Sequence, residues 1–200
     1  MLLESLTDYS QGGEQALILK SLEGIAAGRF LDIGAFNAKA LSNTRALYEM
    51  GWGGVVVEPS PGPVKGLIQE YGTSDRVIVV AAAVGLDRHM VKFHATDDAL
   101  STSESRNLEI WKERGGFYGT WYVPMVTLHE IMHQFGAFDF VNIDTEGTSL
   151  QLLEALLATE MKPRCISVEH DGQMHEAVHM GTRAGYLVRG ATSENLIFSL

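Results

Sequence analysis

The sequence contains a single cysteine, Cys165, among its 200 residues, so the chain cannot form an internal disulfide. Because disulfides are typical of oxidising compartments, this composition predicts a reducing, cytoplasmic location. The sequence also has no hydrophobic run long enough to span a bilayer, and no basic region followed by an apolar one at its N-terminus. We therefore expect neither a membrane partner nor a secretory leader.

Basic residues are scarce as well. There are 15 Lys and Arg residues against 25 Asp and Glu residues, a net charge of −10, and the basic residues form no cluster. Proteins that bind nucleic acid need basic surfaces, so this balance argues against a nucleic-acid partner. A hydrophobic content of 46% in 200 residues is enough for one good core, and no linker or repeat interrupts it. We expect a single domain over residues 1–200.

A hydrophobic stretch at 30–33 leads through Asp32 into Gly34 and Ala35, and residues 38–50 then have a helical pattern. This order predicts a buried parallel strand, a tight turn and a helix. Glycine adopts backbone conformations that other residues avoid, and the two small residues leave room for a ligand on the main chain. The turn is therefore a candidate binding site, although an ordinary buried strand and turn would show the same pattern.

The next predicted strand, 54–58, ends in Glu58 and is followed by Pro59. An acid at the end of the second strand of a doubly wound sheet is placed to accept hydrogen bonds from both hydroxyls of a ribose. The turn after the first strand lacks the G-x-G-x-x-G pattern that holds a pyrophosphate, and Asp32 would repel a diphosphate. S-adenosylmethionine has a ribose, no phosphate and two cationic groups, so it is the cofactor that fits these residues.

Strand and helix patterns alternate along the rest of the chain, which indicates an α/β fold. The predicted strands are 30–33, 54–58, 77–80, 138–143, 164–168, 186–189 and 195–200, with a short extra strand at 90–94. The predicted helices are 14–25, 38–50, 61–72, 150–157 and 173–184, with another that opens at Thr127 in a capping box with Glu130. We expect a Rossmann-like, doubly wound, seven-stranded and mostly parallel sheet that closes with an antiparallel hairpin.

Residues 95–123 have no clear periodicity and combine glycines with aromatic residues. A long irregular segment inside a compact domain is usually functional, so we expect a loop that covers the substrate. The alternative is that Trp111 and Trp121 merely attach this loop to the core.

Several segments, in the same order, resemble the FkbM family of S-adenosylmethionine-dependent methyltransferases. They are Ser10–Glu14, Asp32–Ala35, Ser42–Thr44, Gly51–Gly54, Glu58–Pro61, Asn142–Gly147, Val168–His170, Gly185–Tyr186 and Asn195–Phe198. The resemblance covers nearly the whole chain and implies the class I methyltransferase fold. The chain departs from the family at Asn37 and Ala38, where the family often has Asp-Gly, near the methionine part of the cofactor.

The resemblance implies a set of residues that contact S-adenosylmethionine, including small residues after the third strand that lie against the adenine. On this sequence the set comprises Asp32, Gly34, Ala35, Asn37, Ser42, Glu58, Pro59, Ala82, Ala83 and Asp144. The resemblance also implies O-methylation of a small molecule, such as a sugar, a polyol or a polyketide-type natural product.

Reacting groups gather at the carboxyl ends of the strands in a doubly wound sheet. Asp144 and Glu146 follow the fourth strand of the predicted sheet, and Glu169 and His170 follow the fifth. A hydroxyl acceptor needs a base, and imidazole titrates near neutrality, so His170 is the candidate general base, with Asp144 and Glu169 as further catalytic residues. Alternatively, the four side chains hold a divalent cation that binds the acceptor.

Two other functions fit parts of the sequence. His129-Glu130-Ile131-Met132-His133 matches the H-E-x-x-H pattern of zinc metalloproteases, with two histidines on one helical face. Against that hypothesis, Glu130 is also explained as a helix cap, and a protease leaves the cofactor residues without a purpose. The second alternative is a binding module that keeps the cofactor site without turnover.

Overall fold

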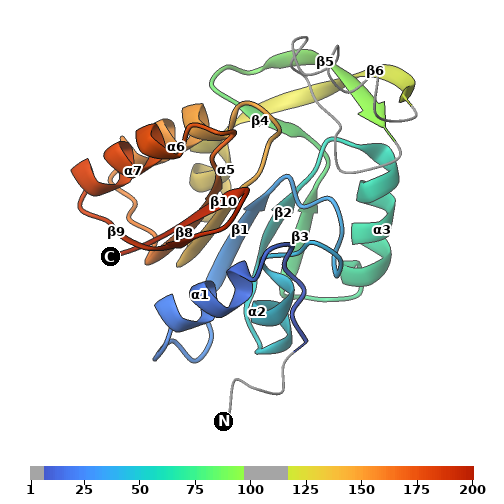
Figure 1. The fold of residues 1–200 in the computed structure, drawn as a ribbon. Coiled ribbons are helices and arrows are strands. Elements are labelled where there is room, and N and C mark those ends of the chain that lie inside the picture. The colour runs from blue at the N-terminus through green and yellow to red at the C-terminus, as the bar shows by residue number, and fades with distance from the viewer. Residues whose placement is uncertain (1–6, 97–116) are drawn as a thin grey trace.

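A computed structural model of the chain describes residues 7–96 and 117–200 (Figure 1). Its centre is a seven-stranded sheet with the order β3-β2-β1-β7-β8-β10-β9. The strands are β1 (Arg29–Ile33), β2 (Gly53–Val57), β3 (Val77–Val80), β7 (Phe140–Ile143), β8 (Cys165–Glu169), β9 (Leu187–Ala191) and β10 (Asn195–Ser199). Neighbours from β3 to β8 pair in parallel, whereas β10 is antiparallel to both β8 and β9. The predicted seven-stranded α/β sheet and its closing hairpin are confirmed.

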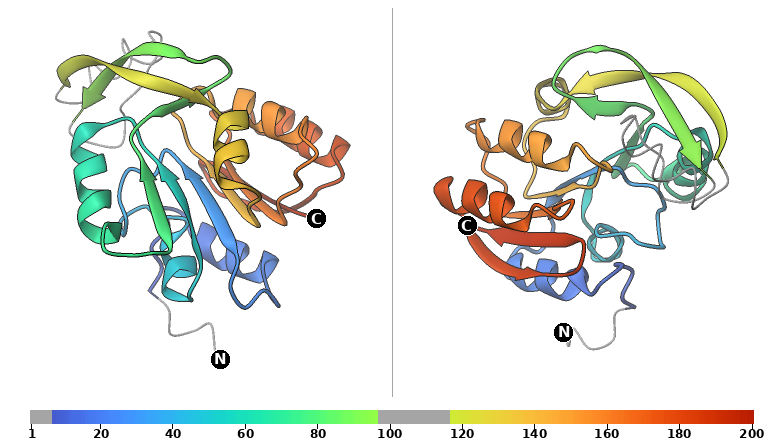
Figure 2. Two further views of the ribbon diagram at one scale, coloured as in Figure 1. Left: turned by 180° about the vertical axis from the view of Figure 1, so that it is seen from behind. Right: turned by 45° about the horizontal axis from the view of Figure 1, so that its top comes forward.

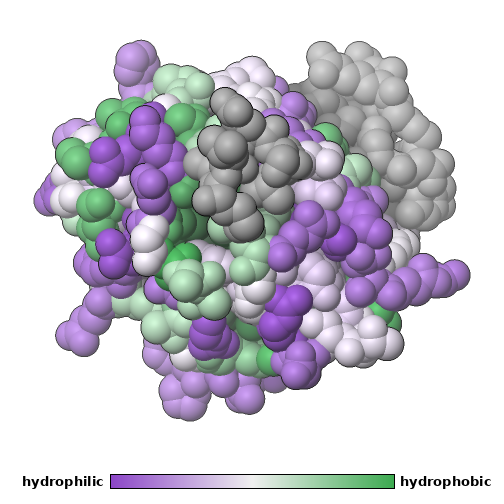
Figure 3. All heavy atoms as spheres, turned by 90° about the horizontal axis from the view of Figure 1, so that it is seen from below, coloured by the Kyte–Doolittle hydropathy of each residue, from purple (hydrophilic) through white to green (hydrophobic). Residues whose placement is uncertain are grey.

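Helices cover both faces of this sheet because its strands are apolar on both sides. Leu31 and Ile33 of β1 face one core cluster, which α5 (Leu128–Phe135), α6 (Ser149–Leu157) and α7 (Met174–Arg183) cover. Phe30 faces the other, which α1 (Glu14–Ser21), α2 (Arg45–Glu49) and α3 (Pro61–Tyr71) cover. Figures 1 and 2 show these two helical layers with the sheet between them. Hydrophilic residues occupy much of the surface seen from below in Figure 3.

The strand order reverses at β1. The chain runs from β1 outward to β2 and β3, and then returns to place β7 on the other side of β1. In open α/β sheets the crevice at such a reversal, at the carboxyl ends of the strands, is where ligands bind. The topology therefore places the ends of β1, β2 and β7 around one potential ligand site.

A second sheet lies beyond the carboxyl end of β3. It consists of β4 (Ala83–Gly85), β5 (His89–Thr96) and β6 (Phe117–Thr127), in the order β4-β6-β5 (Figure 1). The sequence predicted only a short strand here and an irregular loop over 95–123. The prediction of a loop is wrong at both ends of this segment, since residues 95–96 belong to β5 and residues 117–123 belong to β6. These two strands pair antiparallel. Trp111 and the rest of the loop, 97–116, lie outside the described residues.

The predicted helix at 38–50 begins only at Arg45, as α2. The residues before it form an irregular loop in which Phe36 and Leu41 have positive φ angles of 31° and 58°. The side chain of Asn37 accepts hydrogen bonds from the N–H groups of Lys39 and Ala40, at 2.9 and 3.0 Å. Asparagine side chains that bond to the nearby backbone compete with helix formation, which explains the late start.

The other predicted helices are present in the structure, with small shifts of their ends. Thr127 and Glu130 form the predicted capping box at the start of α5, and Pro61 opens α3. The first helix ends at Ser21 rather than Ile25. Within the described part of the chain, no helix is both long and apolar enough to cross a membrane.

Candidate functional site

The turn after β1 packs directly against the turn after β7. Gly34 has a φ angle of 82°, and a β-carbon at this position would overlap the carbonyl oxygen of Asp144. The N–H of Asp144 donates to the carbonyl of Ile33 at 2.9 Å, and the N–H groups of Gly34 and Ala35 donate to Val57, at 2.9 and 3.2 Å. Position 34 therefore requires glycine for a close backbone contact, independently of any ligand.

The carboxylate of Asp32 lies buried beneath this turn in a polar network. Thr44 donates its hydroxyl to one carboxylate oxygen at 2.6 Å, and the amide of Asn142 donates to the other at 2.9 Å. The amide of Asn43 donates in turn to Asn142 at 3.0 Å. Burial raises the pKa of Asp32, and the two hydrogen bonds oppose that rise. Asp32 thus joins β1, β7 and the loop before α2.

Glu58, which follows β2, connects the turns after the first two strands. Its side chain accepts hydrogen bonds from the N–H groups of Phe36, at 3.1 Å, and Ser60, at 2.7 Å. Burial raises the pKa of Glu58, and these hydrogen bonds lower it. The hydroxyl of Ser60 also donates to this carboxylate. A carboxylate has about four acceptor sites, so Glu58 keeps capacity for a ribose hydroxyl.

The other predicted cofactor residues have structural partners of their own. The side-chain oxygen of Asn37 bonds within its loop, as described above, and the hydroxyl of Ser42 accepts from the N–H of Arg45 at 3.1 Å. The side chains of Ala82 and Ala83 are buried in hydrophobic clusters, and Pro59 is half-buried. Their role toward a cofactor stays a prediction.

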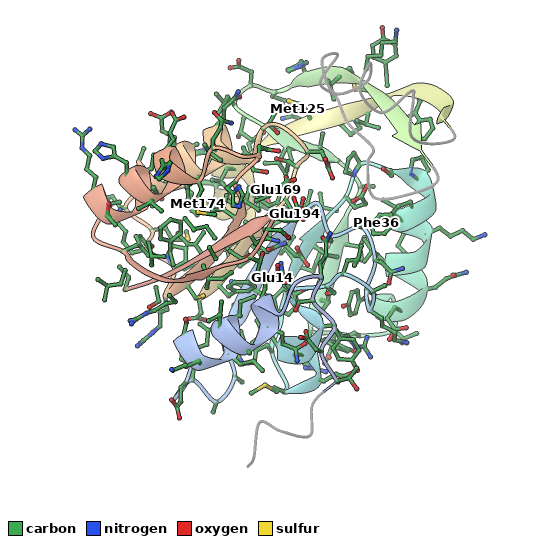
Figure 4. All side chains as sticks on the ribbon, in the orientation of Figure 1. Glu14, Phe36, Met125, Glu169, Met174 and Glu194 are labelled. Atoms are coloured by element: carbon green, nitrogen blue, oxygen red, sulfur yellow. The ribbon has the colours of Figure 1, made fainter. Side chains whose placement is uncertain are left out.

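Three carboxylates meet at the ends of β7 and β8. Asp144, Glu146 and Glu169 each offer an oxygen, and these oxygens lie within 4.8 Å of one another. Glu169 is held in place by the hydroxyl of Ser149, which donates to it at 3.1 Å, and by the N–H of Glu146, at 3.2 Å. Figure 4 shows Glu169 and Phe36 at the same end of the sheet. The structure thus brings together three of the four side chains that the sequence suggested for a metal.

The electrostatics of this acidic group follow from burial and mutual repulsion. Burial raises the pKa of Asp144 well above its usual range, and the charges of Glu169 and Glu146 raise it further. Burial, and then the charge of Asp171, raise the pKa of Glu169. Such a group either keeps a proton between its carboxylates or neutralises its charge with a cation. Carboxylate oxygens are the ligands that Mg²⁺ and Mn²⁺ prefer.

His170 follows Glu169 in the chain but is not part of the acidic group. Its ring Nδ1 accepts a hydrogen bond from the backbone N–H of Gly172 at 3.2 Å. The backbone N–H of His170 donates to the carbonyl oxygen of Glu194 at 2.9 Å. The residue is only 6% exposed, and Nε2 has no hydrogen-bond partner among the described residues. Because Nδ1 is an acceptor, the neutral ring carries its proton on Nε2. As placed, His170 is therefore a hydrogen-bond donor.

Three residues at the carboxyl ends of the central strands have a strained backbone conformation. Phe36, Glu146 and Asp171 follow β1, β7 and β8, which are neighbours in the sheet, and have φ angles of 31°, 50° and 47°. Non-glycine residues in this region cost of order 1–3 kcal/mol each and cluster at functional sites. No local sequence pattern marks these three residues, because positive φ at these residue types arises from tertiary contacts.

Sequence reasoning also assigned no role to Asn142, Thr44 or Ser149, which hold Asp32 and Glu169. A signal for Asn142 was present, since it is a polar residue within the otherwise apolar strand β7. Thr44 and Ser149 gave none, because their partners are distant in the sequence.

The H-E-x-x-H residues lie on α5, where the protease hypothesis has little geometric support. The rings of His129 and His133 are nearly parallel, with centroids 6.3 Å apart. One oxygen of Glu130 accepts from the backbone and hydroxyl of Thr127, and the other from Arg88 at 3.1 Å. In the described part of the chain, no third metal-binding side chain completes a site with the two histidines. Glu130 is therefore a helix cap and an ion-pair partner.

Comparison with known proteins gives one family. Residues 32–187 match a family model described as the methyltransferase FkbM domain, which is more than half of the chain. No protein of curated function matches the sequence significantly.

The fold is similar to those of solved methyltransferases. The FkbM methyltransferase of Methylobacillus flagellatus KT matches with a TM-score of 0.54 and 13% identity over 89% of this chain, which spans only 47% of that protein. A precorrin-6y C5,15-methyltransferase of Geobacter metallireducens GS-15 matches with a TM-score of 0.52 and 12% identity, over 93% of this chain and 87% of that one. At these identities the likeness concerns the fold alone.

Proposed function

Since this chain belongs to the FkbM family of methyltransferases, we propose that it transfers a methyl group from S-adenosylmethionine to a hydroxyl group of a small sugar, polyol or natural product. Family and fold are those of S-adenosylmethionine-dependent methyltransferases. The observation that carries the proposal is the placement of acids on both sides of the β1 turn, with Glu58 after β2 and the Asp144–Glu169 pair after β7 and β8.

The residues around the β1 turn fit the cofactor chemically. Glu58 keeps acceptor capacity for a ribose, and Asp32 and Asp144 supply a negative field for an ammonium and a sulfonium. The same field would disfavour a dinucleotide, whose pyrophosphate is anionic. S-adenosylmethionine supplies an activated methyl group on its sulfonium. The protein has to bind it, align the acceptor and handle the proton of the acceptor hydroxyl.

The acidic group is the place for that proton. Burial raises the pKa of both Asp144 and Glu169, with further rises from Glu169 and Glu146 on Asp144 and from Asp171 on Glu169, and a raised pKa suits a general base at neutral pH better than that of an ordinary carboxylate. His170, with its proton on Nε2, is arranged to donate a hydrogen bond, and would act as a base only after a change of tautomer. We propose that Asp144 and Glu169 accept the acceptor proton and that His170 assists them.

A divalent cation is the alternative use of the same side chains. If Asp144, Glu146 and Glu169 hold Mg²⁺ or Mn²⁺, the ion would bind the acceptor hydroxyls and lower their pKa. The three oxygens within 4.8 Å support this role as well as a shared proton. The expected cytoplasmic location stays part of the proposal and rests on the single cysteine, which excludes an internal disulfide.

The test is a transfer assay with S-adenosylmethionine labelled in its methyl group. Purified protein is incubated with panels of sugar and polyol hydroxyls, with and without Mg²⁺, and S-adenosylhomocysteine and labelled products are measured by mass spectrometry. The proposal predicts a labelled methyl ether. If calorimetry shows cofactor binding but no panel gives a product, the result would support the alternative of a binding module that keeps the cofactor site without turnover. An absence of binding would contradict both.

A further inference from the structure

A cavity of about 460 Å³ opens between α5, the end of β3, β6 and the β4–β5 turn. It is lined by Val80, Arg88, Val126, His129, Glu130, Ile131, His133, Gln134 and Phe135. Its volume is within the range of small-molecule sites, about 300–1,000 Å³. The left view of Figure 2 faces this side of the molecule, with α5 in yellow. Both histidines of the H-E-x-x-H pattern line it, and methyl transfer uses neither of them.

The lining combines an apolar wall with nitrogen donors. Val80 and Val126 come from strands, and Ile131 and Phe135 come from α5. The carboxylate of Glu130 is occupied by the helix cap and by Arg88, at 3.1 Å, so its charge is compensated. That contact uses one of the five N–H donors of the guanidinium, whose side chain is 77% exposed.

The two imidazoles add donors at the same place. His129 and His133 are exposed, lie on one face of α5 and have ring centroids 6.3 Å apart. A neutral imidazole offers one N–H donor and a charged one offers two. The cavity thus presents a guanidinium and two imidazoles beside apolar side chains, in a chain with a net charge of −10.

The cavity is separate from the acidic group. Val80 ends β3 at one edge of the sheet, whereas Asp144 and Glu169 lie at the ends of β7 and β8, three and four strands away in the order β3-β2-β1-β7-β8. Neighbouring strands are about 4.8 Å apart, so the end of β3 is separated from the ends of β7 and β8 by about 14 and 19 Å. A small molecule in the cavity therefore cannot place a hydroxyl at the proposed base.

We propose that this cavity is a second binding site, which takes a small amphipathic anion of the alkyl or aryl carboxylate class. The apolar body lies against Val80, Val126, Ile131 and Phe135. The carboxylate binds Arg88 and the imidazoles of His129 and His133, which recognise it by charge and by N–H donation. The site is independent of the methyl-transfer chemistry.

The probe for this site is octanoate, with 1-octanol as the uncharged comparison of equal chain length. Binding to the full chain is measured by calorimetry and by chemical-shift changes in the NMR spectrum. We expect octanoate to bind at least about tenfold more tightly than octanol, and Arg88→Gln and His133→Gln each to weaken octanoate about tenfold. The matched control is His179→Gln, which removes an exposed imidazole from α7 and should change nothing.

All these side chains are exposed, so the variants should fold, and thermal unfolding checks that they do. S-adenosylmethionine affinity should be the same with and without saturating octanoate. Competition between the two would overturn the proposal, because the cavity would then be an extension of the cofactor site. Equal affinity for octanoate and octanol, no octanoate binding, or equal weakening by His179→Gln would overturn it as well.

Discussion

The carbonyl oxygen of Asp144 lies so close to Gly34 that a β-carbon at position 34 would overlap it. The contact joins the turn after β1, where a cofactor is expected, to the turn after β7, which carries a proposed catalytic carboxylate. The N–H of Asp144 also donates to Ile33 at 2.9 Å. The separation of these two turns is therefore fixed by backbone packing rather than by flexible side chains.

Gly34→Ala should destabilise the protein strongly, by at least about 3 kcal/mol, because it combines an unfavourable φ with a backbone overlap. Gly24→Ala is the matched control, since Gly24 has a φ of 90° and nothing within 4 Å of an added β-carbon. The free energy of unfolding of the control should fall by only about 1–2 kcal/mol, which is the cost of a left-handed conformation at a non-glycine residue. Urea unfolding of both variants measures the difference. Equal losses would show that the contact with Asp144 relaxes easily.

Asn142→Leu should lower the free energy of unfolding by about 1–3 kcal/mol, because it leaves one oxygen of the buried Asp32 without its donor. Ser167 is the register neighbour of Asn142 on β8, and its buried hydroxyl has no hydrogen-bond partner among the described residues. Ser167→Ala should therefore be nearly neutral. Denaturant unfolding compares the two. A larger loss for Ser167→Ala would contradict the role given to the network.

Glu58→Gln should weaken S-adenosylmethionine binding by about 1.5–3 kcal/mol, since charge-assisted hydrogen bonds to the ribose are lost. The glutamine keeps an oxygen for Phe36 or Ser60, so the turn should survive. Calorimetric titration measures the affinity, with Glu176→Gln, an exposed change on α7, as the control. Unchanged affinity in Glu58→Gln would remove Glu58 from the cofactor site.

The stability of the protein should depend on pH through Asp144, whose pKa is raised by burial and by Glu169 and Glu146. A raised carboxyl pKa stabilises the fold fully below the unfolded pKa, about 3.9, and this stabilisation is lost as the pH rises through the folded pKa. Asp144→Asn should therefore raise the melting temperature at pH 8 more than at pH 5. Glu154→Gln, an exposed change on α6, should show no such dependence. If the group holds a cation, Mg²⁺ should stabilise the wild type and not Asp144→Asn.

His170→Ala separates catalysis from cofactor binding. Asp144 and Glu169 are proposed to take the proton, and His170 to assist as a donor, so Asp144→Asn should lower methyl transfer by about 10²-fold or more and His170→Ala by less. His170→Ala should keep its affinity for S-adenosylmethionine within a few-fold, whereas Asp144→Asn should also weaken cofactor binding, because Asp144 supplies part of the negative field at the cofactor site. The assay uses an acceptor from the hydroxyl panel. A greater loss in His170→Ala than in Asp144→Asn would return the base role to His170.

The sequence by itself determined the sheet and its order of elements. Short apolar runs such as 54–58 and 77–80 alternate with helical patterns. Because strands must pair with one another and helices must cover their apolar faces, this alternation is compatible with few folds other than an α/β sheet. Local chemistry also set some helix ends, because Thr127 and Glu130 are three residues apart and Pro61 suits only a first helical turn. The family followed from motifs of this local kind.

Tertiary structure decided what those local signals could not. The pairing of β5 with β6, and the hydrogen bond that joins Thr44 to Asp32, depend on contacts between residues far apart in the sequence. The pKa values of Asp144 and Glu169 depend on burial and on neighbours from another strand. The proton on His170 depends on which backbone N–H meets Nδ1. Fold class is encoded in local periodicity, whereas the chemistry of the site depends on which side chains the packed sheet brings together.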